Sequence, residues 1–393
     1  MNRLKRRKQE LTQYFVDPDI GRRRIRQFTS YSVIGAMLAG LALSANEVRA
    51  QSSVQLYGIV DDALTYTTNV RGGHAWAQFS GVGRNDRWGF RGTEDLGGGY
   101  RAIFRLENGF GINNGTLGQG GLEFGRQAFV GLASDRLGTI SLGRQYDFMT
   151  TNLSSFSAGS TIPSVFAFHL GDYDRLGGER INNSVKYVTP TLAGLQFGAL
   201  YAFGGQAGDF ARNSAMGFGA GYTQGPLRLA AAYTAIRNYQ AVFGIGTPVL
   251  GTPLSGSGAL GTLARPVVFD KLVVAGAAAG YQLGPVLMQG VFTLVDFQNN
   301  GRSSVLRTAE GNTQYKVSPA FFVAASYAYS KLDNDHWNQI GLGADYFLST
   351  RTDVYLNAVY LRASSGVTAE MFLLSPSSSN TQMIVSLGLR HSF

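Results

Sequence analysis

The last twelve residues, Gln382-Met-Ile-Val-Ser-Leu-Gly-Leu-Arg-His-Ser-Phe393, alternate between two kinds of side chain. One set is Met383, Val385, Leu387, Leu389, His391 and Phe393, and the other is Gln382, Ser386, Gly388, Arg390 and Ser392. An extended strand places these two sets on opposite faces. One face suits hydrocarbon and the other suits water, which is typical of a strand in the wall of a transmembrane β-barrel.

The same alternation recurs from Gln51 onward, in segments of about ten residues. In residues 54–61, Val54, Leu56, Gly58 and Val60 alternate with Gln55, Tyr57, Ile59 and Asp61. Phe321, Val323, Ala325, Tyr327 and Tyr329 make another such face. A soluble β-sandwich is the alternative interpretation, but its strands are usually only five or six residues long. The longer segments here favour a membrane barrel.

Short turns and longer connections alternate between these segments. Turn chemistry marks 95–99, 135–138, 189–190, 225–226, 284–285, 318–319 and 349–351. Longer connections are expected near 69–84, 111–122, 147–180, 206–213, 239–269, 298–309, 332–336 and 364–380. The sequence therefore predicts an all-β fold, a 16-stranded antiparallel transmembrane β-barrel with long extracellular loops and short periplasmic turns. A barrel of this size encloses a lumen wide enough for water.

The formal charge of +9 is concentrated at the N-terminus. Residues 1–50 hold ten Lys or Arg and four acidic residues, which leaves 24 basic and 21 acidic side chains in the rest of the chain. This distribution argues against a nucleic-acid partner. The absence of cysteine excludes disulfides, thiolate nucleophiles and cysteine-ligated zinc.

The first fifty residues have the pattern of a secretory signal. Arginines at 22–24 and 26 precede an apolar stretch, residues 32–44, and then Val48-Arg49-Ala50, which resembles a cleavage site. A signal anchor is the alternative, but about 13 apolar residues fall short of the roughly 20 that a bilayer requires. We therefore expect residues 1–50 to be an N-terminal extension with a cleavable signal peptide, and residues 51–393 to be one barrel domain.

Strand parity selects the charged residues that face water. Arg87 and Arg91 fall opposite Trp88 and Phe90. The further lumen-facing residues are Arg101, Arg105, Glu107 and Arg126, each out of phase with neighbouring aromatic or apolar residues. Arginine against lipid costs roughly 2–4 kcal/mol at mid-depth, so we expect several guanidinium groups to line one wall of the lumen.

Several stretches resemble the trimeric general porins of Gram-negative outer membranes. They are Ser53-Val-Gln-Leu-Tyr-Gly-Ile-Val-Asp61, Asp86-Arg-Trp-Gly-Phe-Arg-Gly-Thr-Glu-Asp-Leu-Gly-Gly-Gly99, Arg126-Gln-Ala-Phe-Val-Gly-Leu132, Leu142-Gly-Arg-Gln-Tyr146, Arg180-Ile-Asn-Asn-Ser-Val-Lys-Tyr187 and Gly388-Leu-Arg-His-Ser-Phe393. Their order and spacing run from residue 53 to the last residue. The resemblance implies a homotrimer in outer-membrane lipid and lipopolysaccharide, a water-filled channel for small hydrophilic solutes and ions, and no cofactor. It also implies that Phe393 is part of the assembly signal that the barrel-insertion machinery reads.

The resemblance further implies a constriction, where a ladder of basic residues faces a third loop that folds into the barrel. By matching motif, Arg87, Arg126 and Arg180 fall on the family's constriction arginines, with Arg144 as a neighbour. The folded-in loop would be 147–180, whose acidic residues are Asp147, Asp172, Asp174 and Glu179. It lacks the Pro-Glu-Phe-Gly-Gly element of many relatives, and its middle, residues 154–163, is uncharged. Basic residues outweigh acidic ones here, which predicts a mild preference for anions.

Other functions remain as alternatives. A substrate-specific channel would line its path with aromatic side chains or a dense basic ladder, whereas strand parity here sends most aromatics outward. A barrel enzyme needs a nucleophile beside a base, but His391 has the opposite parity to Ser386 and Ser392. A plugged surface adhesin would show no stable conductance. The histidines at 74, 169, 336 and 391 lack the spacing of a metal site, so we expect a channel and not an enzyme.

Overall fold

The computed structural model describes residues 53–256 and 262–393, without the side chains of Thr262 and Ala264. The predicted leader, residues 1–50, lies outside this part of the chain. The strands are β1 (Ser53–Val70), β2 (Gly73–Ser80), β3 (Arg87–Gly97), β4 (Tyr100–Gly109), β5 (Gln127–Ser134), β6 (Gly138–Tyr146), β7 (Arg180–Val188), β8 (Leu195–Ala202), β9 (Ala215–Gln224), β10 (Leu227–Phe243), β11 (Thr247–Val249), β12 (Thr252–Leu254), β13 (Thr262–Leu283), β14 (Val286–Asn299), β15 (Arg302–Ser318), β16 (Phe321–Leu332), β17 (Asp335–Phe347), β18 (Thr352–Ala363) and β19 (Thr381–Ser392).

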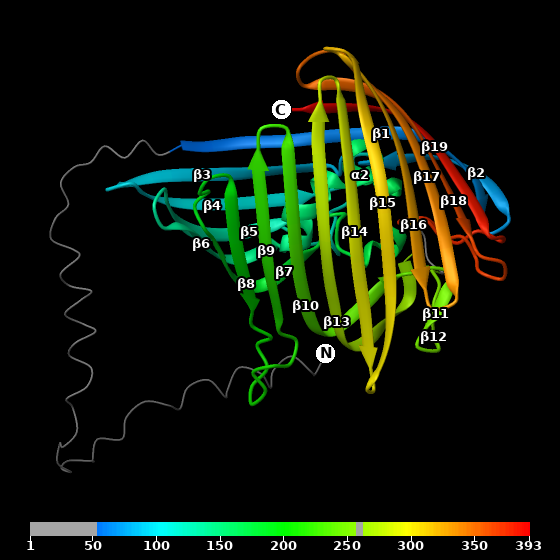
Figure 1. The fold of residues 1–393 in the computed structure, drawn as a ribbon, viewed down its shortest axis with the longest axis horizontal. Helices are drawn as coiled ribbons and strands as arrows, with labels where there is room; N and C mark the ends of the chain where they lie inside the picture. The colour runs from blue at the N-terminus through cyan, green and yellow to red at the C-terminus, as the bar shows by residue number, and fades with distance from the viewer. Residues whose placement is uncertain (1–52, 257–261) are drawn as a thin grey trace, which may run out of the picture. The chain divides into compact units, whose positions relative to one another are not determined.

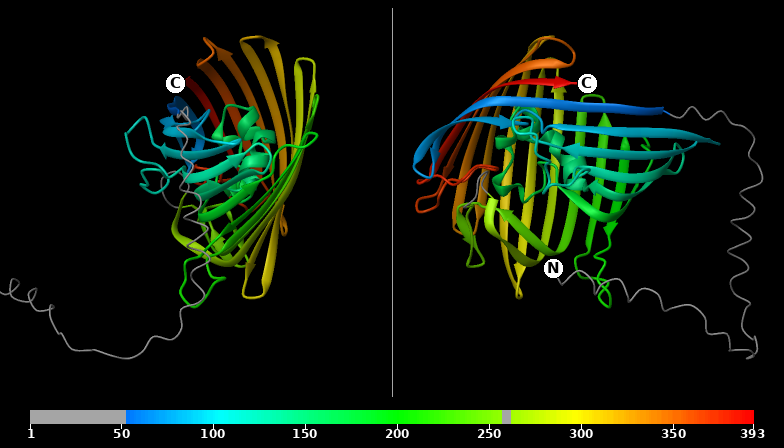
Figure 2. Two further views of the ribbon diagram at one scale, coloured as in Figure 1. Left: turned by 90° about the vertical axis from the view of Figure 1, so that its left-hand side faces the viewer. Right: turned by 180° about the vertical axis from the view of Figure 1, so that it is seen from behind.

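Antiparallel pairing between consecutive strands closes a single barrel, apart from the small β11–β12 hairpin (Figures 1 and 2). The first half of β1 pairs with β3 and its second half with β2, so β2 and β3 together occupy one position in the wall. The sheet of 17 strands therefore makes a 16-stranded barrel. Its seam is the pairing of β1 with β19, from Ile59 opposite Ser392 to Thr67 opposite Ile384. The predicted fold class is confirmed.

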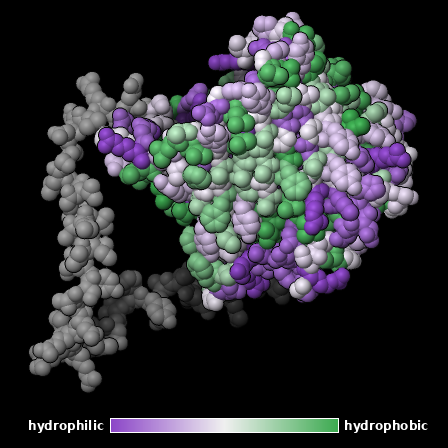
Figure 3. Space-filling view, in the orientation of Figure 1, coloured by the Kyte–Doolittle hydropathy of each residue, from purple (hydrophilic) through white to green (hydrophobic). Residues whose placement is uncertain are grey.

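The two faces of the wall differ as the alternation predicts. On the last strand Leu387 and Leu389 are 53% and 54% exposed, whereas Ser386, next to Leu387, is fully buried. In the visible face of Figure 3, apolar side chains gather over the middle of the strands, and hydrophilic ones are denser toward the lower edge. No helix among the described residues has the length and apolar character needed to cross a bilayer.

All seven predicted tight turns connect adjacent strands, but three of the expected long connections are wrong. A fourth, 239–269, is too long, because β10 continues to Phe243 and β13 begins at Thr262. Residues 69–84 contain a two-residue turn and strand β2, and residues 298–309 and 332–336 contain the two-residue turns 300–301 and 333–334. Asn300 and Gly301 both have positive φ, at 50° and 72°, as tight hairpin turns require. These strand ends carry polar residues on both faces, so their sequence resembles that of a loop. Their backbones nevertheless continue the hydrogen-bonded ladder of the sheet.

Two long connections pack against each other between β10 and β13 and between β18 and β19. The amide of Gly256 donates to Glu370 Oε1 at 2.8 Å, and the rings of Phe243 and Phe372 meet at 5.0 Å. Burial raises the pKa of Glu370 to about 7, and hydrogen bonds from the amides of Gly256 and Gly246 oppose that rise. The connections 244–256 and 364–380 therefore form a packed unit.

Candidate pore constriction

The connection 147–180 lies inside the barrel and carries short helices. They are η1 (Met149–Leu153), η2 (Ser154–Phe156), α2 (Ala158–Thr161), η3 (Val165–Ala167) and η4 (Leu170–Asp172). Figures 1 and 2 show these helices enclosed by the strands. Most apolar side chains of this connection are buried, including Met149, Leu153, Ile162 and Phe166, each with no exposed surface. A loop with such an apolar content needs a surface to cover it, and the inner wall supplies that surface.

Glycines of the wall make room for the loop. A Cβ placed on Gly198 of β8 or Gly219 of β9 would lie 2.3 or 2.4 Å from the ring of Phe148. On the other side of the barrel, a Cβ on Gly341 of β17 would lie 2.6 Å from Ile162. These glycine recesses let the loop backbone approach the wall closely.

Polar contacts fix the same loop at three further places. Glu310 of β15 accepts from the amide of Ala158 at 2.7 Å and lies 2.9 Å from His169 Nε2. The amide of Val165 donates to the carbonyl of Val82 at 2.7 Å. Asn357 of β18 donates to the carbonyl of Pro163 at 2.5 Å. The loop is thus held against the wall both by apolar packing and by hydrogen bonds.

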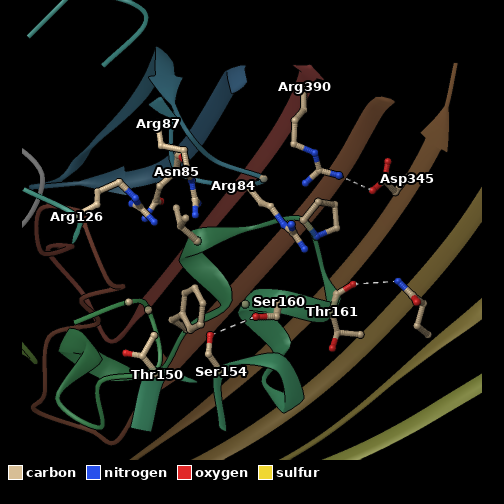
Figure 4. A pocket seen from close by; sticks show the side chains of 18 of the residues that line it. Arg84, Asn85, Arg87, Arg126, Thr150, Ser154, Ser160, Thr161, Asp345 and Arg390 are labelled. Carbon is tan, nitrogen blue, oxygen red and sulfur yellow. Dashed lines mark hydrogen bonds and ion pairs between the residues drawn. The ribbon is translucent and has the colours of Figure 1, made fainter. Parts of the chain in front are cut away.

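Between the loop and the opposite wall is a cavity of about 450 Å³. Its charged lining consists of Arg84, Arg87, Arg126, Arg390 and Asp345. Its loop side carries hydroxyl and apolar groups, among them Thr150, Ser154, Ser160, Thr161 and Pro163. Figure 4 shows Arg84, Arg87 and Arg126 extending from the wall toward the loop. The cavity therefore has a basic wall and an uncharged loop face.

Arg126 is the most deeply buried of these arginines, at 3% exposure. Its Nε donates to Glu107 Oε1 at 2.9 Å, and a terminal nitrogen donates to the hydroxyl of Tyr146 at 2.7 Å. Glu107 also accepts from the hydroxyl of Tyr57 at 2.8 Å. A buried ion pair that further hydrogen bonds support holds a guanidinium rigidly, so Arg126 presents a fixed charge that Glu107 partly balances.

The other three predicted constriction arginines differ in position. Arg87 lines the cavity, and its Nε donates to the carbonyl of Asn85 at 3.0 Å. Arg180 stacks over the ring of Tyr146, with its carbon 5.0 Å from the centroid. Arg144 donates to the carbonyl of Gly125 at 2.7 Å. Arg180 and Arg144 thus flank the cavity lining without belonging to it.

The further lumen residues Arg91, Arg101 and Arg105 lie nearer the tight turns. Arg91 and Arg105 stand over the ring of Tyr57, at 5.5 and 5.9 Å. Arg101 pairs with Asp135 at 2.7 Å, and this partner lowers the pKa of the Asp135 carboxyl through its hydrogen bond and its charge. These arginines flank the approach to the cavity from the turn end.

Three of the four loop acids have partners within the loop itself. Asp147 pairs with Arg175, Asp174 lies 2.5 Å from His169 Nδ1, and Asp172 accepts from the amide of Gly177 at 2.7 Å. All three are at most 3% exposed, and Glu179 is half-buried. None of the four lines the described cavity, so their role at a constriction stays a prediction.

Sequence reasoning missed Arg84, Asp345 and the pairing of His169 with Glu310. Arg84 fell within an expected connection, and Asp345 pairs at 3.0 Å with Arg390, a residue assigned to the water-facing side of the last strand. Parity along β17 would have placed Asp345 on the same side as Gly341 and Gly343. The pairing of His169 with Glu310 joins residues 141 positions apart, for which the sequence carries no signal.

The residues proposed for other chemistry are separated. His391 contacts the hydroxyl of Thr352 at 2.9 Å and lies on the exposed face, while Ser386 is buried on the other face. Among residues 53–256 and 262–393, no group of three or more potential metal ligands is found.

Comparison with known proteins gives consistent matches. The family model described as Gram-negative porin matches residues 35–366. An outer membrane porin protein of Bordetella pertussis is 31% identical, covering 91% of this chain and 98% of the relative. Outer membrane porin protein 32 of Delftia acidovorans is 29% identical, with the same coverage. The solved anion-selective porin from Comamonas acidovorans superposes with a TM-score of 0.72 at 24% identity, covering 87% of this chain and all of that one.

Proposed function

The chain belongs to the Gram-negative porin family, and from that membership we propose how its pore is narrowed and which ions it favours. It is an outer-membrane channel for passive diffusion and not an enzyme. We propose that residues 147–180 constrict the channel, because they cross the lumen and dock on the inner face of β8, β9, β15 and β17. Solutes then pass between this loop and the basic wall.

We propose a mild preference for anions, and the charge of the cavity lining carries this proposal. Four arginines line the cavity against one carboxylate, Asp345. That carboxylate already pairs with Arg390 at 3.0 Å. The loop side offers no charge among its lining residues. Fixed charge at a narrowing biases permeation by sign, so this lining favours chloride over potassium.

Reversal potentials across a KCl gradient in planar bilayers test the proposal. The wild-type channel should pass chloride more readily than potassium. Arg87→Gln should lower the chloride-to-potassium permeability ratio by roughly twofold, because one unit charge at about 8 Å in water, screened by about 0.1 M salt, shifts the energies of the two ions by about 0.2 kcal/mol in opposite directions. Arg101→Gln is the matched control, because Arg101 lies outside the cavity and is paired at the turn end. A cation-preferring wild type would refute the proposal.

The remaining family properties are also proposals for this chain. We propose cleavage after Ala50, a homotrimer, and contact with lipopolysaccharide. We also propose that the insertion machinery reads the last strand through Phe393. The charge pattern of residues 1–50 and the outward, 44% exposed ring of Phe393 support the first and last of these. The N-terminal sequence and native mass of the purified protein test the cleavage and the assembly.

A further inference from the structure

The wall is interrupted between β2, which ends at Ser80, and β3, which begins at Arg87. We call the intervening residues 81–86 the arginine shelf. Gly81 takes a φ of +71°, and its amide donates to the carbonyl of Asp61 at 2.6 Å. Gly83, Arg84 and Asn85 of the shelf line the cavity, together with Arg87 that follows it. The interruption therefore takes the chain out of the ladder and carries arginine into the lumen.

Asp61 of β1 and Tyr355 of β18 hold the shelf through hydrogen bonds with its backbone amides. One oxygen of Asp61 accepts from the Tyr355 hydroxyl at 2.5 Å, and the other accepts from the amide of Arg84 at 2.5 Å. The Tyr355 hydroxyl in turn accepts from the amide of Gly83 at 3.0 Å. Both side chains are 1% exposed. Buried polar groups with satisfied partners fix local geometry strongly.

Close packing leaves this support little freedom. A Cβ on Gly83 would lie 2.8 Å from both Asp61 Oδ2 and the Tyr355 ring, and one on Gly388 would lie 2.2 Å from that ring. Asp86 at the end of the shelf accepts from the amide of Asp61 at 2.6 Å. The shelf also reaches the loop through the bond from Val165 to the carbonyl of Val82. Wall, shelf and loop are thus joined at one place.

Arg84 differs from the other cavity arginines. Arg126 and Arg390 each pair with a carboxylate, and Arg87 donates to the carbonyl of Asn85. The described residues show no side-chain hydrogen bond or ion pair for the Arg84 guanidinium, which is exposed to the lumen. Its position is set through its own backbone amide, which Asp61 holds. The charge of Arg84 therefore remains available to a passing ion.

We propose that Asp61 and Tyr355 are positioning residues for ion selectivity, acting through the backbone of the shelf to place the unpaired charge of Arg84 in the channel. This inference rests on the proposed anion preference. Under this inference the buried carboxylate of Asp61 changes ion selectivity in the direction opposite to that expected from its negative charge. A carboxylate acting by charge alone disfavours anions, whereas Asp61 acting as a hydrogen-bond acceptor favours them.

The experiment compares reversal potentials of reconstituted channels carrying Arg84→Gln, Tyr355→Phe, Asp61→Asn or Tyr187→Phe. Tyr187 of β7 is the control, because its hydroxyl also donates one hydrogen bond, to the carbonyl of Leu137 at 2.6 Å, and it lies neither in the constriction loop nor in the cavity lining. Arg84→Gln should lower the chloride-to-potassium permeability ratio on the order of twofold. Tyr355→Phe and Asp61→Asn should lower it as well, and Tyr187→Phe should leave it unchanged.

The double variant Arg84→Gln/Tyr355→Phe shows whether Tyr355 acts through Arg84. If it does, the second substitution adds no further change, because the charge to be positioned is already gone. Additive changes would overturn the inference, as would an increased anion preference in Asp61→Asn. If Tyr355→Phe yields no channels, Gly83→Ala displaces the same support sterically, and it should lower the ratio in the channels that form.

Failure of the inference and failure of the proposed function give different results. A wild-type channel without anion preference overturns both. An anion-preferring wild type whose Tyr355→Phe and Gly83→Ala channels keep the full preference, while Arg84→Gln loses part of it, overturns only the positioning role. Heat-dependent mobility on denaturing gels confirms that each variant has formed a folded barrel before its selectivity is compared.

Discussion

At the scale of single residues, His169 is the most constrained group in the loop. Its Nδ1 lies 2.5 Å from Asp174 and its Nε2 lies 2.9 Å from Glu310, and none of the three side chains is more than 3% exposed. A neutral imidazole carries only one N–H. Donation to both carboxylates at once therefore requires the imidazolium form. The result is a charged bridge between the loop and β15.

Replacing His169 by glutamine should release the loop. The substitution leaves two buried carboxylates without a cation, and breaking a buried pair in this way costs about 3–5 kcal/mol. Single-channel conductance should rise as residues 147–180 leave the lumen, and trypsin should cleave after Arg175, which is 3% exposed in the docked loop.

His336→Gln is the control, because His336 is at the start of β17 and stacks on Tyr329. The double variant His169→Gln/Glu310→Gln should recover part of the protection, since one of the two unpaired charges is removed. Wild-type conductance and full resistance to trypsin in His169→Gln would show that the bridge does not hold the loop.

Single residues were predicted from sequence only where strand parity applied. Arg87, Arg126 and Glu107 have the opposite parity to Trp88, Phe129 and Leu106, and the structure places all three on the inner face. Arg84 stands in the shelf, where the ladder is broken and parity has no meaning. The basic partners of Asp147 and Asp174 lie within the same loop, and residue spacing in an irregular loop does not determine which side chains meet.

At the scale of elements, the wall and the loop fit because glycines of the wall face large apolar side chains of the loop. Phe148 occupies the space beside Gly198 and Gly219, and a lysine, Lys186, stands 4.5 Å from its ring centroid. The sequence shows the abundance of glycine but not its purpose, because a lumen-facing glycine in a strand has the same pattern whether it meets a loop or water. Gly221, which has nothing within 4 Å of its Cβ position, illustrates the second case.

Gly219→Ala should disturb the anchor of the loop. Its Cβ would lie 2.4 Å from the Phe148 ring and 2.8 Å from Asn152, and overpacking of this kind typically costs about 1–3 kcal/mol. We expect noisier single-channel currents and a lower temperature of barrel denaturation on gels. Gly221→Ala, two residues along on the same face of β9, should behave as wild type. Equal behaviour of the two variants would show that the recess at Gly219 does not matter.

At the scale of the whole molecule, the alternation was sufficient to predict a closed 16-stranded barrel, and the polar extensions of its strands were not recognised. The predicted number of strands was nevertheless correct, because each wrongly predicted long connection still joined two strands of the wall. Hairpins such as β14–β15 continue to Asn299 and Arg302. Alternation signals a strand only where one face is apolar, so the sequence reports the lipid-facing belt more clearly than the ends beyond it.

Closure of the whole barrel depends on the seam between the first and last strands. Gly58 and Phe393 exchange two backbone hydrogen bonds of 3.1 Å. A Cβ at Gly58 would lie 2.2 Å from Cζ of the Phe393 ring and 2.8 Å from the carbonyl oxygen of Arg87. The terminal ring thus lies across a glycine of β1, an arrangement in which an aromatic residue covers backbone that glycine leaves bare.

Gly58→Ala should therefore impair closure, because the methyl group must displace either the ring or the backbone of β3. Refolding of purified protein into detergent separates this effect from recognition by cellular machinery, and the fraction that gains heat-dependent mobility on gels measures it. Gly73→Ala is the control, since its Cβ would have only one neighbour, at 3.9 Å. Adding Phe393→Ala to Gly58→Ala should restore part of the folded fraction, because the ring clash is removed while the contact with Arg87 remains. If Gly58→Ala refolds as completely as Gly73→Ala, the seam tolerates a side chain at this position, and closure depends on the β1–β19 ladder alone.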